Sequence, residues 1–363
     1  MNKTFFPEEF LEKYRKLLDN EFDEFLKYSK KKIPKSIWVN SIKVAPQKLR
    51  EKLEGKGIEE TKKLNELNEN GTETRVKKEL NEKKTEKEKN EIKKNSNWKL
   101  KEIPFAENGF DLLLAPQKPA DCDEFREGLF NLQEKSSMLP AIVLNPIPGE
   151  RVLDGCSAPG NKSLQLACLM KNKGELICVE KNITRFKSLK FNLKKFGLTC
   201  AEAKLGNLLD AETKQKFDKV LLDVPCSSEG LVRKKFDALK EWTPQLVKRK
   251  SELQKKLILK GFDLLKEKGR MVYATCSLSP EENEEVIDFL LKKRNNAKGM
   301  EIKAKRIELM EKNSKNEKEF KARNGLKEFN GMKYKKEIEN CMRIYPQDND
   351  SQSFFLCLIE KLH

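Results

Sequence analysis

Apolar residues at helical spacing open the chain. From Pro7 to about Lys30 they recur every three or four positions, which predicts one amphipathic helix. Residues 36–43 then alternate as strands do, Pro46 begins a second helix, and residues 98–114 return to strand-like order. This pattern predicts a small α+β domain over residues 1–125.

The rest of the chain alternates short apolar runs with helical periodicity. Strands are expected at residues 151–154, 176–180, 203–205, 219–223 and 269–276, and helices at 164–170, 184–196 and 246–265. A last apolar run, Ser353 to Ile359, is expected to form an edge strand. Strands that alternate with helices predict an α/β domain with a parallel, doubly wound sheet over residues 126–363.

Two stretches rich in Lys, Glu and Asn interrupt this pattern, at about 61–97 and 292–339. The first carries few apolar residues, so the burial it offers cannot offset the entropy lost on ordering. We expect the first to be a disordered or loosely helical insertion. A solvated loop is favoured there over an RNA-binding arm, because its Lys and Glu nearly balance.

Charge narrows the choice of partners. The 363 residues carry a formal charge of +17, which favours a polyanion such as RNA over a membrane. No apolar run reaches membrane-spanning length, and the first residues lack the apolar core of a signal peptide. We expect a monomer in the cytoplasm, or in the nucleus or nucleolus if the source is eukaryotic.

The cysteines and the single histidine restrict which catalytic groups and metal sites the chain can have. The nine cysteines form no C-x-x-C pair, so neither a zinc site nor a disulfide framework is predicted, and most should be reduced and buried. The one histidine is His363, the last residue, which excludes histidine triads and histidine–metal sites. No metal is predicted, and Cys, Asp, Glu and Lys are left for catalysis.

A strand, a tight loop and a helix over residues 151–163 form the candidate cofactor site. The loop turns through Gly155, Pro159 and Gly160 and aims a helix N-terminus at a ligand, as in nucleotide-like cofactor sites. A phosphate-loop NTPase is the alternative. Its motif requires fixed spacing, and Asn161 makes this loop one residue too long.

Further candidates follow other strands. Glu180 comes about twenty residues after the loop, where a carboxylate accepts hydrogen bonds from a ribose. Asp223 and Cys226 follow one strand and Cys276 follows another. Ligands bind at the carboxyl ends of parallel strands, so these groups should meet at one edge of the sheet.

Four blocks resemble the RNA (cytosine-5)-methyltransferase family, the Nop/Sun or RsmB-like proteins. They are Asp154-Gly-Cys-Ser-Ala-Pro-Gly-Asn-Lys162, Asp223-Val-Pro-Cys-Ser-Ser-Glu-Gly230, Tyr273-Ala-Thr-Cys-Ser-Leu-Ser-Pro-Glu-Glu-Asn-Glu284 and Arg343-Ile-Tyr-Pro346 with Phe354-Phe355. The resemblance covers most of residues 125–361. It implies a class I, Rossmann-like S-adenosylmethionine-dependent methyltransferase behind a small RNA-contacting domain.

The resemblance also implies residue roles. Cys276 would attack cytosine C6, because C5 needs an added thiolate to become nucleophilic, and Cys226 would assist release. Asp223 would hold the N3 and N4 side of the base, and Lys162 would face the base or its phosphate. Cofactor contacts would come from Cys156, Ser157, Ala158, Pro159, Gly160, Asn161, Lys162, Glu180, Arg185, Asn207 and Asp223.

Four positions depart from the family's pattern. Asn207 stands where an Asp usually binds the adenine amine, and Glu229 where Gly is common. Trp38 stands where Arg is frequent, and Gln347 where His commonly follows Arg-x-x-Pro.

The predicted function is S-adenosylmethionine-dependent methylation of cytosine C5 in structured RNA, with tRNA favoured over rRNA. A non-enzymatic RNA-binding or assembly factor and the NTPase remain as alternatives.

Overall fold

The computed structural model describes residues 6–55, 98–115, 118–212, 215–295, 302–305 and 320–362. The insertion predicted at 61–97 lies outside the described residues, as does most of the one at 292–339. Within these ranges, no helix is both long enough and apolar enough to cross a membrane.

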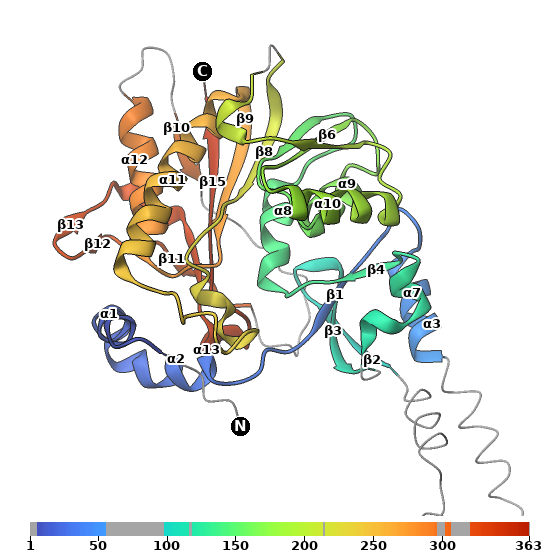
Figure 1. The fold of residues 1–363 in the computed structure, drawn as a ribbon, viewed down its shortest axis with the longest axis horizontal. Coiled ribbons are helices and arrows are strands. Elements are labelled where there is room, and N and C mark those ends of the chain that lie inside the picture. The colour runs from blue at the N-terminus through green and yellow to red at the C-terminus, as the bar shows by residue number, and fades with distance from the viewer. Residues whose placement is uncertain are drawn as a thin grey trace, which may run out of the picture.

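A nine-stranded sheet runs through the centre of the described structure (Figure 1). Its strand order is β11-β14-β15-β9-β8-β5-β6-β7, and β10 also pairs with β15. The strands are β5 (Arg151–Asp154), β6 (Glu175–Glu180), β7 (Ala201–Leu205), β8 (Phe217–Asp223), β9 (Leu265–Thr275), β10 (Ile302–Lys305), β11 (Arg323–Asn324), β14 (Met342–Ile344) and β15 (Phe354–Lys361).

The strands from β7 to β9 are parallel, which confirms the predicted alternation. The prediction of an edge strand at the C-terminus is wrong. β15 runs antiparallel between β9 on one side and β14 and β10 on the other, and all its residues are buried. The continuous apolar run of residues 354–359 reflects burial on both faces rather than an edge position.

Helices cover both faces of this sheet (Figure 1). They are α8 (Leu139–Leu144), α9 (Asn161–Leu169) and α10 (Ile183–Phe196) on one face, and α11 (Pro244–Asp263) and α12 (Glu284–Asn295) on the other. Neighbouring strand residues divide between the two layers: Val152 packs in the cluster of α8–α10, and Leu153 in that of α11 and α12. Alternation within a strand therefore builds two cores on one sheet.

A separate four-stranded sheet has the order β2-β3-β1-β4. Its strands are β1 (Ser36–Val39), β2 (Lys99–Ile103), β3 (Ala106–Leu114) and β4 (Phe130–Leu132), and α3 (Pro46–Gly55) and α7 (Asp123–Arg126) adjoin it. These elements agree with the predicted strands and helix of the small domain. β4, however, lies beyond the boundary expected at residue 125.

The N-terminal helical segment differs from the prediction in two ways. It is divided into α1 (Glu8–Leu18) and α2 (Phe22–Ser29), because Asp19 adopts a positive φ of 47° and breaks the helix. Its apolar face packs on Trp242, Leu278 and Tyr345 of the large-sheet part, not on the small sheet. The helices are thus joined to the small sheet in sequence and to the large sheet by packing.

Residues 30–35 link α2 to β1 and are fixed by Arg233, which is 1% exposed. The Arg233 guanidinium donates to the carbonyls of Lys31 at 3.2 Å and Ser351 at 2.7 Å and pairs with Asp350 at 2.5 Å. Residues 320–339 are also ordered, contrary to the expected interruption. They form β11, the hairpin β12 (Glu328–Phe329) and β13 (Met332–Lys333), and a 3-10 turn before β14; α13 (Pro346–Asn349) follows β14.

Candidate active site

The loop between β5 and α9 is held against the end of β6. Ser157 donates to the carbonyl of Val179 through both its amide, at 3.0 Å, and its hydroxyl, at 2.9 Å. The Ala158–Pro159 peptide is cis, and Gly160 has a φ of 105°, which favours glycine. The loop therefore delivers the first turn of α9 to the carboxyl end of the sheet, as the sequence predicted.

Glu180 and Arg185 fasten the far side of this loop. Glu180, at the end of β6, is 4% exposed and accepts from the Asn182 amide at 2.8 Å. Arg185 pairs with Glu180 at 3.3 Å and donates to the Ala158 carbonyl at 2.5 Å. A buried carboxylate beside an open loop suits a ribose, and Arg185 holds both in place.

Asn207 follows β7 and caps the 3-10 turn after it. Its Oδ1 accepts from the Leu209 amide at 3.3 Å, and its Nδ2 donates to Asp210 at 3.2 Å. Asn207 therefore orients Asp210, a carboxylate at the same strand end that the sequence analysis did not single out.

The two cysteines meet. Cys226 follows β8 and Cys276 follows β9, and their sulfur atoms lie 3.1 Å apart. Pairing of β8 with β9 brings them together, as expected for the ends of neighbouring parallel strands. The hydrogen bond with Cys276, with burial adding to it, raises the pKa of Cys226 well above its ordinary value. Cys226 therefore keeps its proton in the folded protein.

A cation–carboxylate pair forms the next part of the site. Lys162 Nζ lies 2.6 Å from Asp223 Oδ2 and 3.1 Å from Ser137 Oγ. The lysine comes from α9 and is 9% exposed, whereas the Asp223 side chain is 31% exposed. Lys162 Nζ also lies 5.7 Å from the centre of the Phe354 ring. Asp223 is therefore held as an accessible, charge-balanced acceptor.

Asp154 lies beneath the loop at the end of β5 and is 1% exposed. Its Oδ2 accepts from Ser163 at 2.7 Å, while its Oδ1 has no hydrogen-bond partner among the described residues. Burial raises the pKa of Asp154 to about 7. Cys156, on the same loop, is half-buried, and burial raises its pKa as well, so it is not an activated thiol.

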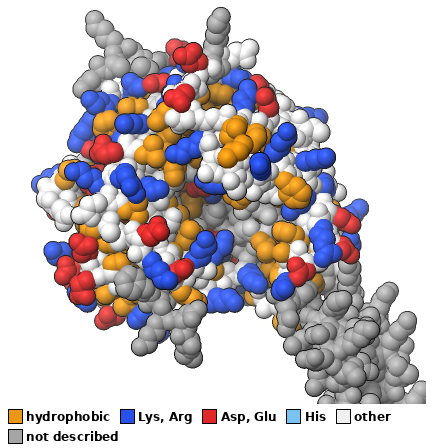
Figure 2. All heavy atoms as spheres, in the orientation of Figure 1, with side chains coloured by type: hydrophobic (Ala, Val, Ile, Leu, Met, Phe, Trp, Pro, Cys, Tyr) orange, Lys and Arg blue, Asp and Glu red, His pale blue; other side chains and the backbone are white. Residues whose placement is uncertain are grey.

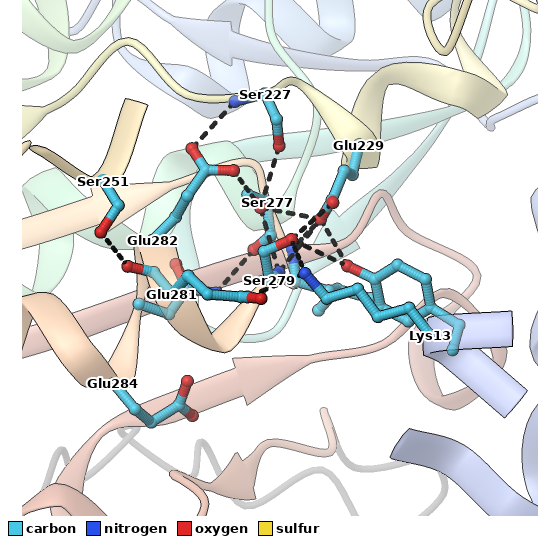
Figure 3. A network of polar contacts seen from close by, with 12 residues as sticks. Lys13, Ser227, Glu229, Ser251, Ser277, Ser279, Glu281, Glu282 and Glu284 are labelled. Carbon is cyan, nitrogen blue, oxygen red and sulfur yellow. Dashed lines mark hydrogen bonds and ion pairs between the residues drawn. The ribbon is translucent and has the colours of Figure 1, made fainter. Parts of the chain in front are cut away.

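Glu229 has a structural explanation that the sequence did not provide (Figure 3). It is 3% exposed and accepts hydrogen bonds from Tyr14, Trp242 and the segment 277–279 that follows Cys276. The position that favours glycine is its neighbour Ser228, whose φ is 64°.

Two other departures lie elsewhere. Trp38 is 1% exposed and packs in the core between the sheets, so it offers no surface to RNA. Gln347 is half-buried on α13 and lines a cavity of about 220 Å³ with Tyr28, Lys135 and Phe105.

Comparison with known proteins decides the family. Residues 141–360 match the family model described as 16S rRNA methyltransferase RsmB/F. The chain belongs to the RsmB/F family of RNA methyltransferases. Membership confirms the predicted RNA (cytosine-5)-methyltransferase family, the class I fold and the cofactor S-adenosylmethionine, and it speaks against the NTPase and non-enzymatic alternatives.

Relatives of two kinds are similar. A tRNA (cytosine(49)-C(5))-methyltransferase of Pyrococcus abyssi is 37% identical over 73% of this chain and 81% of its own length. A ribosomal RNA small subunit methyltransferase F of Vibrio campbellii is 32% identical over 99% of this chain, which spans 64% of that protein.

Solved structures have the same fold. A methyltransferase homolog from Pyrococcus horikoshii superimposes with a TM-score of 0.74 at 28% identity, over 98% of this chain and 96% of that one. NSun6 from the same organism, solved with SFG, gives 0.72 at 20% identity over 99% of both chains, which is a likeness of fold.

The residues of this chain fit S-adenosylmethionine. Glu180 offers a buried carboxylate at the end of β6, the kind of acceptor that ribose hydroxyls require, and α9 begins at a loop bent by Gly160. A Cβ at Gly206, between β7 and Asn207, would meet no atom within 4 Å, so the strand end is open there. Asn207 and Asp210 offer oxygen acceptors beside it.

Proposed function

We propose that this enzyme methylates C5 of a cytosine in structured RNA through a covalent bond between Cys276 and cytosine C6. The observation that carries the proposal is the pair of thiols 3.1 Å apart at the ends of two parallel strands. Buried structural cysteines need no such pairing at a strand edge beside a cofactor loop.

Attack by Cys276 makes C5 reactive. The sulfur of Cys276 bonds to C6, and the electron pair of the C5–C6 double bond moves to C5. S-adenosylmethionine supplies an electrophilic methyl group when bound. As negative charge develops in the ring, N3 takes a proton from solvent, and Asp223 accepts hydrogen bonds from N3 and from the N4 amino group. Lys162 balances the charge of Asp223 at 2.6 Å and also contacts Ser137.

Cys226 completes the cycle. After methyl transfer the C5 and N3 protons leave to solvent water, while Cys226 keeps its own proton. The C6–S bond then breaks, the ring double bond returns and Cys276 leaves as a thiolate. The raised pKa of Cys226 suits a role in release, because the retained proton lets Cys226 donate a hydrogen bond to the departing Cys276 sulfur 3.1 Å away.

tRNA is the favoured substrate, with rRNA as the alternative. The similar tRNA enzyme is 37% identical to this chain and the similar rRNA enzyme 32%, which favours the tRNA relative. The formal charge of +17 supports binding to RNA phosphates, and Figure 2 shows a face hollowed near its centre with Lys and Arg side chains around the hollow. The target base must leave its stack to reach a site at the sheet edge. We further propose a cytoplasmic monomer.

Two cysteine variants test the reaction. Cys226→Ala should attack and methylate but release slowly, so it should form a protein–RNA species that survives a denaturing gel. Cys276→Ala should form none and should not methylate. The probe is a pool of transcribed tRNAs and small-subunit rRNA fragments with S-adenosylmethionine, and sequencing the trapped RNA locates the target.

Cys122→Ala is the matched control, because this half-buried cysteine is on no strand end of the large sheet. It should behave as the wild type. Trapping by Cys276→Ala would reverse the two roles. An active wild type with trapping by neither variant would refute the covalent mechanism.

A further inference from the structure

Two buried carboxylates, Glu229 and Glu282, come from the turns that follow the paired cysteines, and the proposed reaction uses neither. Figure 3 shows both among their hydrogen-bond partners. Glu229 is on the turn after Cys226, and Glu282 is on the turn after Cys276. They are 3% and 0% exposed. Such groups are costly to bury unless their surroundings satisfy them, so their partners show what they hold.

Glu229 fixes the backbone that carries Cys276. It accepts from the amides of Leu278 at 2.9 Å and Ser279 at 3.0 Å, and from the hydroxyl of Ser277 at 2.7 Å. The next residue, Gly230, donates its amide to the Cys276 carbonyl at 2.6 Å. One turn therefore holds Cys276 through its own carbonyl and through the three residues that follow it.

Glu282 fixes the backbone that carries Cys226. Its Oε2 accepts from the amide of Ser227 at 2.9 Å and from Gln254 Nε2 at 2.8 Å. Its Oε1 lies 2.9 Å from Ser277 Oγ. Each carboxylate thus comes from one cysteine's segment and holds the segment of the other.

The Ser277 hydroxyl joins the two carboxylates and has one proton to give. It lies 2.7 Å from Glu229 and 2.9 Å from Glu282, so it can donate to only one of them. Glu229 meets amide, indole and hydroxyl donors, which require an acceptor and favour its charged form. Ser277 Oγ also accepts from the Ser279 amide at 3.0 Å and the Ser227 hydroxyl at 3.2 Å. A second buried carboxylate on the same hydroxyl is stabilised by holding a proton, because the charge of Glu229 disfavours another charge beside it.

We propose that charged Glu229 and neutral Glu282, bridged by the Ser277 hydroxyl, act as positioning residues that hold Cys276 against Cys226 for attack on the base. This inference rests on the proposed function for its role in catalysis. The arrangement itself is a property of the folded protein.

Electrostatics agree with the geometry. Burial alone would raise the pKa of Glu229, but the charge of Lys13 and hydroxyl donors outweigh it and lower the pKa. Burial, and then the charge of Glu229, raise the pKa of Glu282 to about 7. The other titratable groups that face the pair are Lys13 and Tyr14 of α1, Cys226, Tyr273 of β9 and Glu281.

Amide variants separate the two carboxylates. Gln in place of Glu282 keeps an oxygen for Ser227 and gives Ser277 a donor, so it imitates the neutral acid. Gln in place of Glu229 must turn its NH₂ toward either the indole N–H of Trp242 or the backbone amides, and both are donors. The change to Gln should therefore be tolerated at Glu282 and should impair the protein at Glu229.

The experiment measures the single-turnover methylation rate of a transcribed tRNA pool from pH 5.5 to 9. Glu229→Gln should lower the rate about 10- to 100-fold, the range expected when a reacting group is misplaced by up to 1 Å, with little change in KM. Glu282→Gln should match the wild type at pH 6 and lack the wild type's fall in rate above about pH 7. Glu281→Gln is the matched control, because Glu281 pairs with Lys13 at 2.8 Å and is 30% exposed.

Alkylation of Cys276 by iodoacetamide, followed by mass spectrometry, tests the arrangement without RNA. Its pH dependence should change in Glu282→Gln and not in Glu281→Gln. An equal loss of methylation rate in Glu229→Gln and Glu282→Gln would overturn the inference. A fall in rate above pH 7 that persists in Glu282→Gln would overturn it as well. If the pH dependence of Cys276 alkylation changes as expected but the wild type methylates no RNA, the proposed function is refuted. The arrangement of Glu229 and Glu282 is then still supported.

Discussion

Breaking the buried ion pair between Arg343 and Glu284 should strongly destabilise the active-site segment. Arg343 Nη1 lies 2.6 and 2.7 Å from the two oxygens of Glu284, and the two residues are 1% and 0% exposed. Arg343 also donates to the carbonyl of Leu278, two residues after Cys276. Removing the cation would leave a buried carboxylate and a buried carbonyl without their partner.

The magnitude follows from this burial. Loss of one partner of a buried pair costs about 3–5 kcal/mol, because the remaining charge stays uncompensated. We expect Arg343→Met to lower the free energy of unfolding by that amount, and Glu284→Gln to lower it similarly. Met keeps the length of the aliphatic chain, so little of the loss should come from a cavity.

Urea unfolding of both single variants and the double variant measures the coupling. The double variant should be more stable than the sum of the single losses predicts, by about 2 kcal/mol or more, because it leaves no lone charge. Arg126→Met is the control, since the Arg126–Asp123 pair is exposed and such pairs contribute about 1 kcal/mol or less. Additive losses would refute the assignment of the effect to the ion pair.

Two further predictions concern RNA binding and pH. The affinity for RNA, measured by fluorescence anisotropy, should fall steeply with salt, because phosphate contacts release counterions; a flat dependence would contradict this. Asp154 has its pKa raised from 3.8 in the ordinary state to about 7 in the fold, so the unfolded chain loses that proton first and stability should decline between about pH 4 and 7. Asp154→Asn should remove this part of the decline. The melting temperature of the variant minus that of the wild type should therefore increase from pH 5 to pH 8. An unchanged difference between the two proteins would count against a buried, protonated Asp154.

The sequence was sufficient for elements with strong local signals. The strands that end at Glu180, Asp223 and Thr275 are short apolar runs between helices, and their parallel pairing follows from that alternation. The meeting of Cys226 with Cys276 could be inferred for the same reason. It depends on where strands end rather than on any detail of side-chain packing.

Long-range packing was beyond the sequence. The helical face of residues 8–29 shows that these helices bury something, but periodicity does not identify the partner, which is the surface around Trp242. Glu229 has no local signal for its role either. Its donors come from α1, from Trp242 and from the segment after Cys276, and only the fold brings them together.

The link that Arg233 fixes affects how an RNA substrate can reach the site. The small sheet is joined to the large-sheet part at both of its ends in the chain, by residues 30–35 on one side and by 133–137 on the other. The first link is held by Arg233, and the second carries Ser137, which touches Lys162. Asn40, just after β1, also donates through Nδ2 to the Phe196 carbonyl of α10 at 2.9 Å, so a direct contact as well as the two links opposes hinge motion. The shape change that brings a cytosine to Cys276 should therefore occur mainly in the RNA, and the enzyme should favour sites where loops or ends already loosen the base.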